Sequence, residues 1–222
     1  MRGTARLRGS ARPLYQFSLV PPVERPAGRR VMQPLETPRL TLVPVDARNA
    51  RELWEVLNAP DLRKYQDIPR VRAEEFERQV RTRPKELRPT ASGRFEWVLR
   101  AGVPPAPIGW ISLRITDRSP RIGEVGYSLV MEARGLGYAS EALQAVIDEA
   151  FTAGELDEVQ ACIVPENEAS RRVLDRTGFR EERLLRSGAV IRGRHVDVLL
   201  FSVTRASWDR ARREALPRCR EA

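Results

Sequence analysis

The sequence predicts an α/β (or α+β) fold, in which one sheet is flanked by helices rather than doubly wound. Segments whose apolar residues alternate, as in strands, are separated by segments with helical spacing. Near the end of the chain two strand-like segments follow each other without a helix, which is typical of an antiparallel hairpin. A chain of 222 residues is long enough for one domain with a substantial core.

The first half of the chain is expected to hold one strand, two helices and a hairpin. Asp46 is placed to cap the first helix, whose apolar face holds Leu53, Trp54 and Leu57. Gly102 and three prolines before Ile108 indicate the turn of the hairpin. The first helix is expected from its cap at Asp46 to its end at Pro60, and the other elements over residues 39–45, 73–82, 95–100 and 108–115.

The second half is organised around a strand, a glycine-bearing loop and a helix between residues 122 and 154. Gly154 supplies the stop of this helix, and Gly178 the stop of a shorter helix downstream, with Phe179 as its apolar partner. The remaining elements are expected over residues 158–164, 168–177, 180–185 and 195–203, with a helix or a frayed end after 205.

The loop between this strand and helix has features of a phosphate site. A helix N-terminus presents unpaired N–H groups and the positive end of the dipole, so it favours an anion. Gly135 and Gly137 allow positive φ and a close ligand, and Arg134 adds a positive charge. An ordinary turn with glycines explains the same residues. The loop is neither a Walker loop nor the three-glycine dinucleotide fingerprint.

Four ordered motifs resemble the GNAT acetyltransferase superfamily, and in particular its RimJ/RimL-type branch. The first is Arg134-x-x-Gly137-x-Ala139 after a strand that carries Glu124, and the second runs from Asn167 to Phe179. Two shorter pieces, at 35–40 and 193–198, complete a match over roughly residues 34–208. The resemblance implies a mixed, mostly antiparallel central sheet, flanked by helices and splayed at the acetyl-CoA site.

The resemblance also implies an enzyme, an N-acetyltransferase that moves the acetyl group of acetyl-CoA to a primary amine. The RimJ/RimL-type branch acetylates the N-terminal amines of ribosomal proteins, so the N-terminal amine of a protein is the first expected acceptor. Three alternatives stay open: a small-molecule amine (an amino acid, a polyamine or an antibiotic), a non-catalytic acyl-CoA-binding module, and a nucleic-acid-associated protein.

The cofactor is expected on the strand end, the loop and the first turns of two helices. Backbone N–H groups near Leu129 and Val130 are expected to face the thioester, because related proteins splay two strands there. Asn167 is either the N-cap of its helix or a CoA-contacting amide. The full set of expected cofactor-binding residues is Leu129, Val130, Arg134, Gly135, Leu136, Gly137, Tyr138, Ala139, Ser140 and Asn167.

Two residues are candidates for the chemistry. Glu124 is the expected base, because the family often places one here and an acidic residue is disfavoured inside a strand. The alternative is a solvent-facing or ion-paired carboxylate. Many relatives carry a tyrosine at the position of Leu174, and leucine cannot donate a proton. Ser170 is then the remaining hydroxyl for the thiolate.

Composition limits the partners and the compartment. The net charge of +9 lies in the tails, because residues 34–204 carry 26 basic and 26 acidic residues. This balance argues against a nucleic-acid-binding domain. Cys162 and Cys219 give no disulfide framework, so a cytoplasmic protein is expected, and Cys162 is expected to be buried. One histidine and two separated cysteines furnish no zinc site.

The chain is expected to divide into three parts. Residues 1–33 are expected to be a disordered basic extension, or to follow from an upstream start codon, because Met32 directly precedes the opening strand. Residues 34–208 form the acetyltransferase domain, and residues 209–222 form a basic tail. No segment approaches the length of a membrane span. A homodimer is an open alternative.

Overall fold

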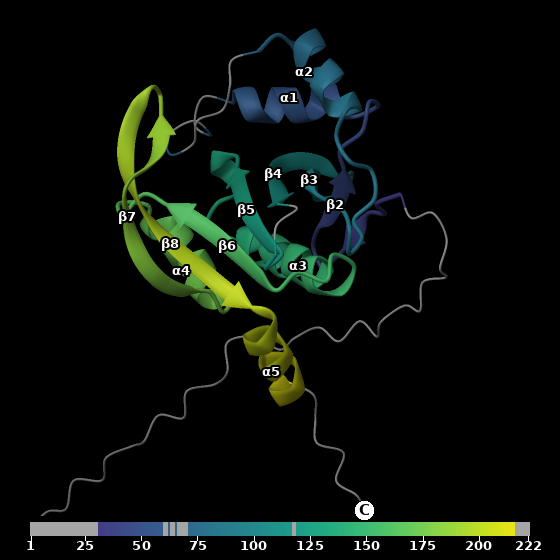
Figure 1. The fold of residues 1–222 in the computed structure, drawn as a ribbon. Helices are drawn as coiled ribbons and strands as arrows, with labels where there is room; N and C mark the ends of the chain where they lie inside the picture. Colours follow the sequence, from purple (N-terminus) through teal and green to yellow (C-terminus); the bar gives the residue numbers. More distant parts are fainter. Residues whose placement is uncertain (1–30, 60–61, 63–64, 66–70, 117–118, 216–222) are drawn as a thin grey trace, which may run out of the picture.

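One mixed sheet of eight strands organises the protein, whose computed structural model describes residues 31–59, 62, 65, 71–116 and 119–215. The strands are Leu35–Glu36 (β1), Thr41–Pro44 (β2), Gly93–Ala101 (β3), Ala106–Ile115 (β4), Ile122–Leu129 (β5), Glu158–Ile163 (β6), Arg180–Ile191 (β7) and Arg194–Thr204 (β8). Their order across the sheet is β1-β2-β3-β4-β5-β6-β8-β7 (Figure 1).

All neighbouring strands are antiparallel except β5 and β6. The parallel pair is connected through a helix, as a parallel pair requires. This confirms the mixed, mostly antiparallel sheet that was expected. The helices are Ala50–Asn58 (α1), Ala73–Arg81 (α2), Tyr138–Thr152 (α3), Glu168–Arg176 (α4) and Arg205–Ala215 (α5).

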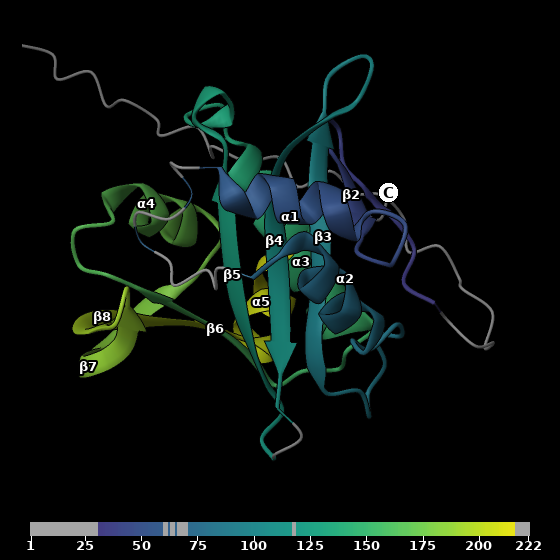
Figure 2. The same ribbon diagram turned by 90° about the horizontal axis from the view of Figure 1, so that it is seen from above.

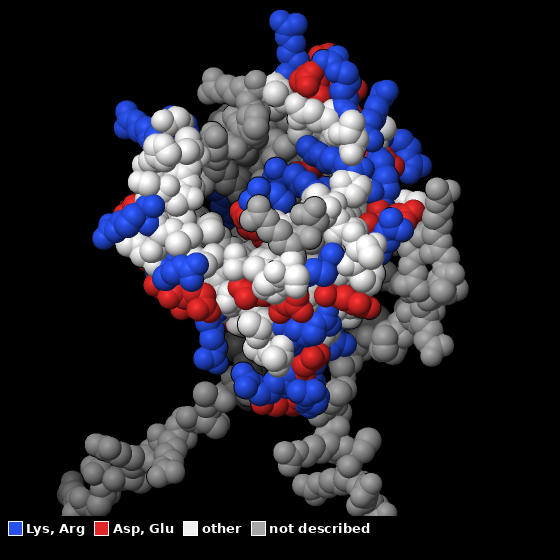
Figure 3. All heavy atoms as spheres, viewed as in Figure 1, with Lys and Arg blue, Asp and Glu red and all other residues white. Residues whose placement is uncertain are grey.

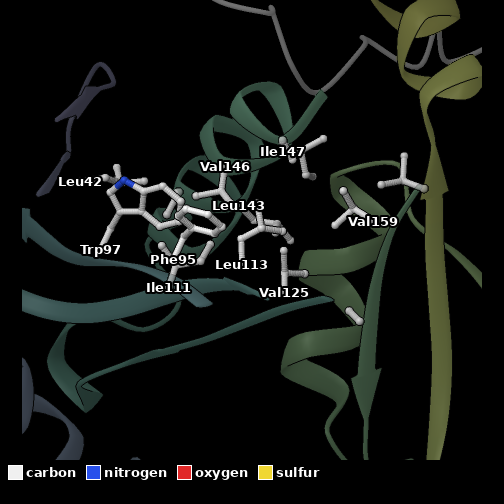
Figure 4. Packing of buried hydrophobic residues seen from close by; sticks show 14 of the residues in the cluster. Leu42, Phe95, Trp97, Ile111, Leu113, Val125, Leu143, Val146, Ile147 and Val159 are labelled. Atoms are coloured by element: carbon white, nitrogen blue, oxygen red, sulfur yellow. The ribbon is translucent and has the colours of Figure 1, made fainter. Parts of the chain in front are cut away.

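The larger core lies between α3 and one face of the sheet. Leu143, Val146 and Ile147 of α3 are fully buried, and they pack on side chains from β3 and β4 such as Phe95 and Ile111 (Figure 4). Apolar residues of α3 recur at helical spacing and those of the strands alternate, so each element turns one apolar face to this core.

A smaller core lies on the opposite face of the sheet, under α1 and α2. Leu53 of α1 and Phe76 of α2 pack with Val98 of β3 and Trp110 of β4. Figure 2 shows α1 crossing over β3, β4 and β5 on this face. The sheet is therefore covered on both faces near its centre.

The sheet splits between β5 and β6, as the resemblance implied. The two strands pair only at Ile122, Gly123 and Glu124 of β5, which lie opposite Glu158, Val159 and Gln160. Beyond Glu124 the strands diverge, and the backbone groups of β5 that would have paired with β6 are left facing the split.

Helix α4 ends as the sequence predicted. Thr177 is its last half-helical residue, and Gly178 follows with a φ of 84°. Gly178 N–H donates to the carbonyl of Asp175, and Phe179 N–H to that of Leu174. These two bonds form a Schellman motif, and Leu174 and Phe179 are both buried beneath it.

Three local predictions differ from the structure. Asp46 does not cap α1: Asn49 is the N-cap, and Asp46 accepts hydrogen bonds from Arg48 instead. Strand β7 continues to Ile191 rather than ending near 185, because irregular pairing with β8 lets a longer strand follow its partner. Helix α5 runs past 208, and Trp208 is buried against Phe151.

The two expected tails lie largely outside the described residues. Residues 31–33 fall within the expected extension and are described. The Met32 N–H donates to the carbonyl of Lys85, and Met32 packs on the larger core. The ordered domain therefore begins before residue 34. Within the described ranges no helix combines the length and apolar character that a bilayer crossing requires.

Candidate active site

The split exposes one set of backbone groups of β5. Val130 N–H donates to the carbonyl of Ile108 on the β4 side, and Thr116 N–H donates to the carbonyl of Ile122. Bonding to one neighbour alternates along an antiparallel strand, so even-numbered residues of β5 bond β4 and odd-numbered residues face β6. The N–H groups of Tyr127 and Leu129 therefore point into the split.

This alternation corrects one expected cofactor contact. The Val130 N–H is bonded to Ile108, so it does not face the thioester as expected, and the contact of the Leu129 N–H stays a prediction. The sequence reasoning did not single out Tyr127, whose N–H points to the same side as that of Leu129. Which residues of β5 bond to β4 depends on the register of the two strands, and the sequence alone does not give this register.

The loop after β5 leads into α3 with two glycines in left-handed conformations. Gly135 has a φ of 76° and Gly137, the N-cap of α3, has a φ of 85°. A side chain on Gly135 would meet nothing within 4 Å, so its backbone conformation, rather than crowding, accounts for the glycine. The predicted strand–loop–helix junction is confirmed in its geometry.

The start of α3 leaves several polar groups without partners. The backbone N–H groups of residues 135–140 donate to no acceptor within the described part of the chain. The Ser140 hydroxyl is buried in the first turn of the helix and also has no partner there. Unpaired donors at a helix N-terminus fit an anion, and a pyrophosphate is one that would use several of them.

A network from the front of the chain braces this loop. The Arg39 guanidinium donates to Glu141 Oε2 at 2.7 Å through Nε and to the carbonyl of Leu136 at 2.8 Å. The Thr37 hydroxyl donates to Glu141 Oε1 at 2.6 Å, and Arg39 also lies over the Tyr138 ring. These contacts join residues about a hundred positions apart and fix the loop against the first turn of α3.

This brace also balances charge. Glu141 lies in the first turn of α3, where a carboxylate is favourable for the helix but would repel an anionic ligand. The ion pair with Arg39 at 2.6 Å offsets that negative charge. The sequence placed the 35–40 motif in the family without assigning a role to Thr37 or Arg39.

Arg134 lies at the strand end rather than over the helix N-terminus. Its Nε donates to the carbonyl of Leu129 at 2.9 Å. This bond turns the strand end toward the loop. The expected contact of Arg134 with phosphate stays a prediction, as do the contacts of Leu136, Tyr138 and Ala139.

The start of α4 meets Tyr127 across the split. Asn167 is the N-cap of α4, and its side chain accepts from Ser170 N–H at 3.2 Å, as the sequence predicted for a cap. The Tyr127 hydroxyl donates to the Ser170 carbonyl at 3.4 Å. Burial raises the pKa of Tyr127, so its phenol stays neutral at ordinary pH and acts as a donor.

Glu124 lies on the other face of the sheet, at the closed end of the split. It is the last β5 residue paired with β6, and its carboxylate accepts from Arg114 of β4 at 2.5 Å. Its side chain is 45% exposed. Arg114 engages one of the two carboxylate oxygens, so Glu124 is ion-paired, as the alternative had it, and its role as a base stays a prediction.

Cys162 lies on the same face as Glu124, two residues beyond the last parallel pair, and it is exposed rather than buried. The expectation of a buried thiol is wrong, because the splay removes the neighbour that would have covered it. Residual desolvation by the surrounding side chains, together with the Glu124 carboxylate, raises the pKa of the Cys162 thiol.

The comparisons with known proteins agree with this geometry. Residues 39–180 match the family model described as an acetyltransferase (GNAT) domain. The uncharacterized N-acetyltransferase p20 of Bacillus licheniformis is 30% identical over 178 residues, which span 80% of this chain and 99% of that protein.

Two solved structures share the fold. The ribosomal-protein-S5-alanine acetyltransferase of Vibrio fischeri has a TM-score of 0.68 at 23% identity, over 80% of this chain and 99% of that one. The spermidine N-acetyltransferase of Vibrio cholerae, solved with CoA and spermine, has a TM-score of 0.65 at 20% identity, over 78% and 99%. At these identities the likeness concerns the fold alone.

Proposed function

Because the chain belongs to the GNAT acetyltransferase family and is an N-acetyltransferase, we propose that it acetylates the N-terminal amine of a protein. The proposal has three parts: where acetyl-CoA is held, which groups serve the transfer, and which amine accepts. The observation that carries it is the set of donors at the start of α3 that have no partner among the described residues.

The donors fit the two polar parts of acetyl-CoA. The N–H groups of residues 135–140 and the Ser140 hydroxyl suit the pyrophosphate. The N–H groups of Tyr127 and Leu129 suit the amides of the pantetheine arm and the thioester carbonyl, because they face the split where a neighbouring strand is missing. Asn167 at the far side of the split suits an amide of the same arm.

Acetyl transfer forms an N–C bond and breaks the C–S bond. The attacking amine must lose a proton, and the thiolate that leaves must gain one. Glu124 accepts the amine proton, directly or through one water, while Arg114 engages its Oε2. A backbone N–H in the split stabilises the charge that develops on the carbonyl oxygen.

The thiolate meets a hydroxyl group at the start of α4. Leu174 is fully buried and supplies no proton. The Tyr127 phenol lies beside Ser170, but its single O–H donates to the Ser170 carbonyl. We assign the Ser170 hydroxyl to the thiolate, through a hydrogen bond or an ordered water.

The acceptor amine approaches from the face of Glu124. Relatives of this fold include enzymes named for a ribosomal protein and for spermidine. A protein N-terminus is preferred, and a small-molecule amine is the second candidate. The cytoplasmic location, the absence of a metal requirement, the lack of nucleic-acid binding and the option of a homodimer stay predictions.

The test is acetyl-CoA-dependent transfer by the full chain to a panel of peptides and small amines, followed by thiol release and by mass spectrometry of the acceptor. The expected result is an acceptor that gains one acetyl group per thiol released. CoA binding by calorimetry with no transfer to any amine would instead support the non-catalytic acyl-CoA-binding module.

A further inference from the structure

A row of charged side chains crosses the sheet beside Glu124. Arg94 of β3 lies opposite Arg114 of β4, and Arg114 lies opposite Glu124 of β5. Directly paired residues point to the same face of a sheet, so all three side chains lie on the face of α1 and α2. In the view of Figure 3, which has α1 and α2 at the top, basic and acidic side chains lie next to one another below these helices.

The positive charge of this row is not fully balanced. Arg94 pairs with Glu96 at 3.0 Å, but Glu96 also pairs with Arg83, so one buried carboxylate serves two guanidinium groups. Arg114 pairs with Glu124. Three cations therefore share two carboxylates in this part of the structure.

The electrostatics reflect this imbalance. Desolvation and then the charge of Arg114 lower the pKa of Arg94. Desolvation and then the charge of Arg94 lower the pKa of Arg83 to about 10. The hydrogen bond and charge of Glu124, in contrast, raise the pKa of Arg114. A cation whose pKa is lowered by a neighbouring cation is stabilised when an anion comes between them. Arg94 and Arg114 are also partly exposed, so such an anion can reach them.

A buried polar group points to the same conclusion. The Trp110 side chain is 4% exposed, and Arg94 lies over its ring at 5.8 Å. Its indole N–H has no acceptor among the described residues. A buried donor without a partner costs free energy, and a ligand oxygen is one group that removes the cost.

From these observations, and resting on the proposed function, we infer that the acceptor carries a carboxylate close to its amine, which Arg94 and Arg114 bind. Neighbouring strands are about 4.8 Å apart, so this carboxylate would lie about 5–10 Å from Glu124. An extended peptide advances about 3.4 Å per residue, which places the carboxylate on the second or third residue of a peptide acceptor.

Arg114 can serve the acceptor and the base together. Its guanidinium has five N–H donors and bonds Glu124 through Oε2, so donors remain for an acceptor carboxylate. A polyamine instead brings positive charge to an arginine row, so it is a poor acceptor.

The experiment measures kcat/KM for two sets of peptides, one varied only at the second residue and one only at the third. The varied residue is Asp, Asn or Lys, and free aspartate and spermidine are further acceptors. We expect the Asp peptide to exceed the Lys peptide by roughly 10-fold or more, the scale of a close charge pair at a binding surface. The Asn peptide should fall between them, and spermidine should be the poorest. A preference for free aspartate over the peptides would place the carboxylate on a small molecule.

The variant that tests the residues is Arg114→Gln, which is exposed and so leaves the core intact. The ratio of Asp to Lys peptide should fall toward 1 in this variant. The matched control is Arg213→Gln on α5, which removes the same charge at the opposite end of the molecule (Figure 1) and should keep the wild-type ratio.

The outcomes separate the two claims. Equal rates for the Asp, Asn and Lys peptides, or an unchanged ratio in Arg114→Gln, would overturn the inference and leave the acetyltransferase intact. A higher kcat/KM for spermidine than for the Asp peptide would also overturn the inference, because the site would then favour a positively charged acceptor. No transfer to any acceptor, with CoA still bound, would overturn the proposed function and this inference with it.

Discussion

The proposed cofactor end and the proposed acceptor face of this site use different chemical groups. The cofactor end uses backbone N–H groups, two glycines and a braced loop between β5 and α3. The acceptor face uses charged side chains from three adjacent strands. The cofactor end is formed by residues close together in the sequence, so a few residue types are enough to predict it. The acceptor face forms only when the three strands pair in the correct register.

The largest effect is expected for a variant of the cofactor end, which binds through backbone N–H groups. Gly137→Val places a branched side chain at a φ of 85°, next to donors that must approach a pyrophosphate. Calorimetry should show CoA affinity reduced by roughly 100-fold or more, about the loss of two charge-assisted hydrogen bonds. Gly193→Val is the matched control, because Gly193 has a φ of 73° in the distant β7–β8 turn. Unchanged CoA affinity in Gly137→Val would remove the loop from the cofactor site.

A variant of Glu124 tests the acceptor face, which uses charged side chains. Glu124→Gln keeps the shape and removes the base, so turnover should fall by about 10²-fold while CoA affinity is retained. Raising the pH should partly restore turnover, because free amine then forms in solution. Glu181→Gln, which removes a similarly exposed partner of an arginine, should have no such effect. If CoA affinity falls together with turnover, Glu124 supports the strand instead of the chemistry.

The brace between the two ends gives a smaller effect. Arg39→Ala removes the contact to Leu136 and leaves Glu141 uncompensated beside the anion site, so CoA affinity should fall by about 10-fold. The double variant Arg39→Ala, Glu141→Gln separates the two causes. Recovery of affinity would assign the loss to charge, and no recovery would assign it to loop position. Arg212→Ala, which also loses a carboxylate and a ring contact, is the control.

The smallest expected effect is a gain in the free energy of unfolding together with a loss of CoA affinity. Ser140→Ala removes a buried hydroxyl that has no partner in the described structure, so the unliganded protein should gain about 1 kcal/mol of unfolding free energy. If that hydroxyl meets the pyrophosphate, CoA affinity falls several-fold at the same time. Ser112→Ala, whose hydroxyl bonds the Gly126 carbonyl, should lose stability instead. A loss of stability in Ser140→Ala would mean that its hydroxyl is already satisfied.

The sequence predicted the parts of this molecule that are local. The left-handed glycines, the Asn167 cap and the Gly178 helix stop each follow from residue type and position, and each is confirmed. The brace through Arg39 could not be predicted, because it depends on where residues about a hundred positions apart meet. The pairing of Glu124 with Arg114 was open because it depends on the register of β4 against β5. The backbone parity that excludes Val130 required the register of β4 against β5.

The split between β5 and β6 also ties the fold to its ligand. Only three residue pairs join the two halves of the sheet directly, so a ligand arm whose amides bond both edges takes the place of missing strand pairs. Its binding free energy then adds to the free energy of unfolding, by about 2.7 kcal/mol at a concentration of 100 times Kd. The amide of Leu129 should exchange with solvent hydrogen quickly in the free protein and slowly when the coenzyme is bound. Cofactor supply would thus set how firmly the two halves of the sheet stay together.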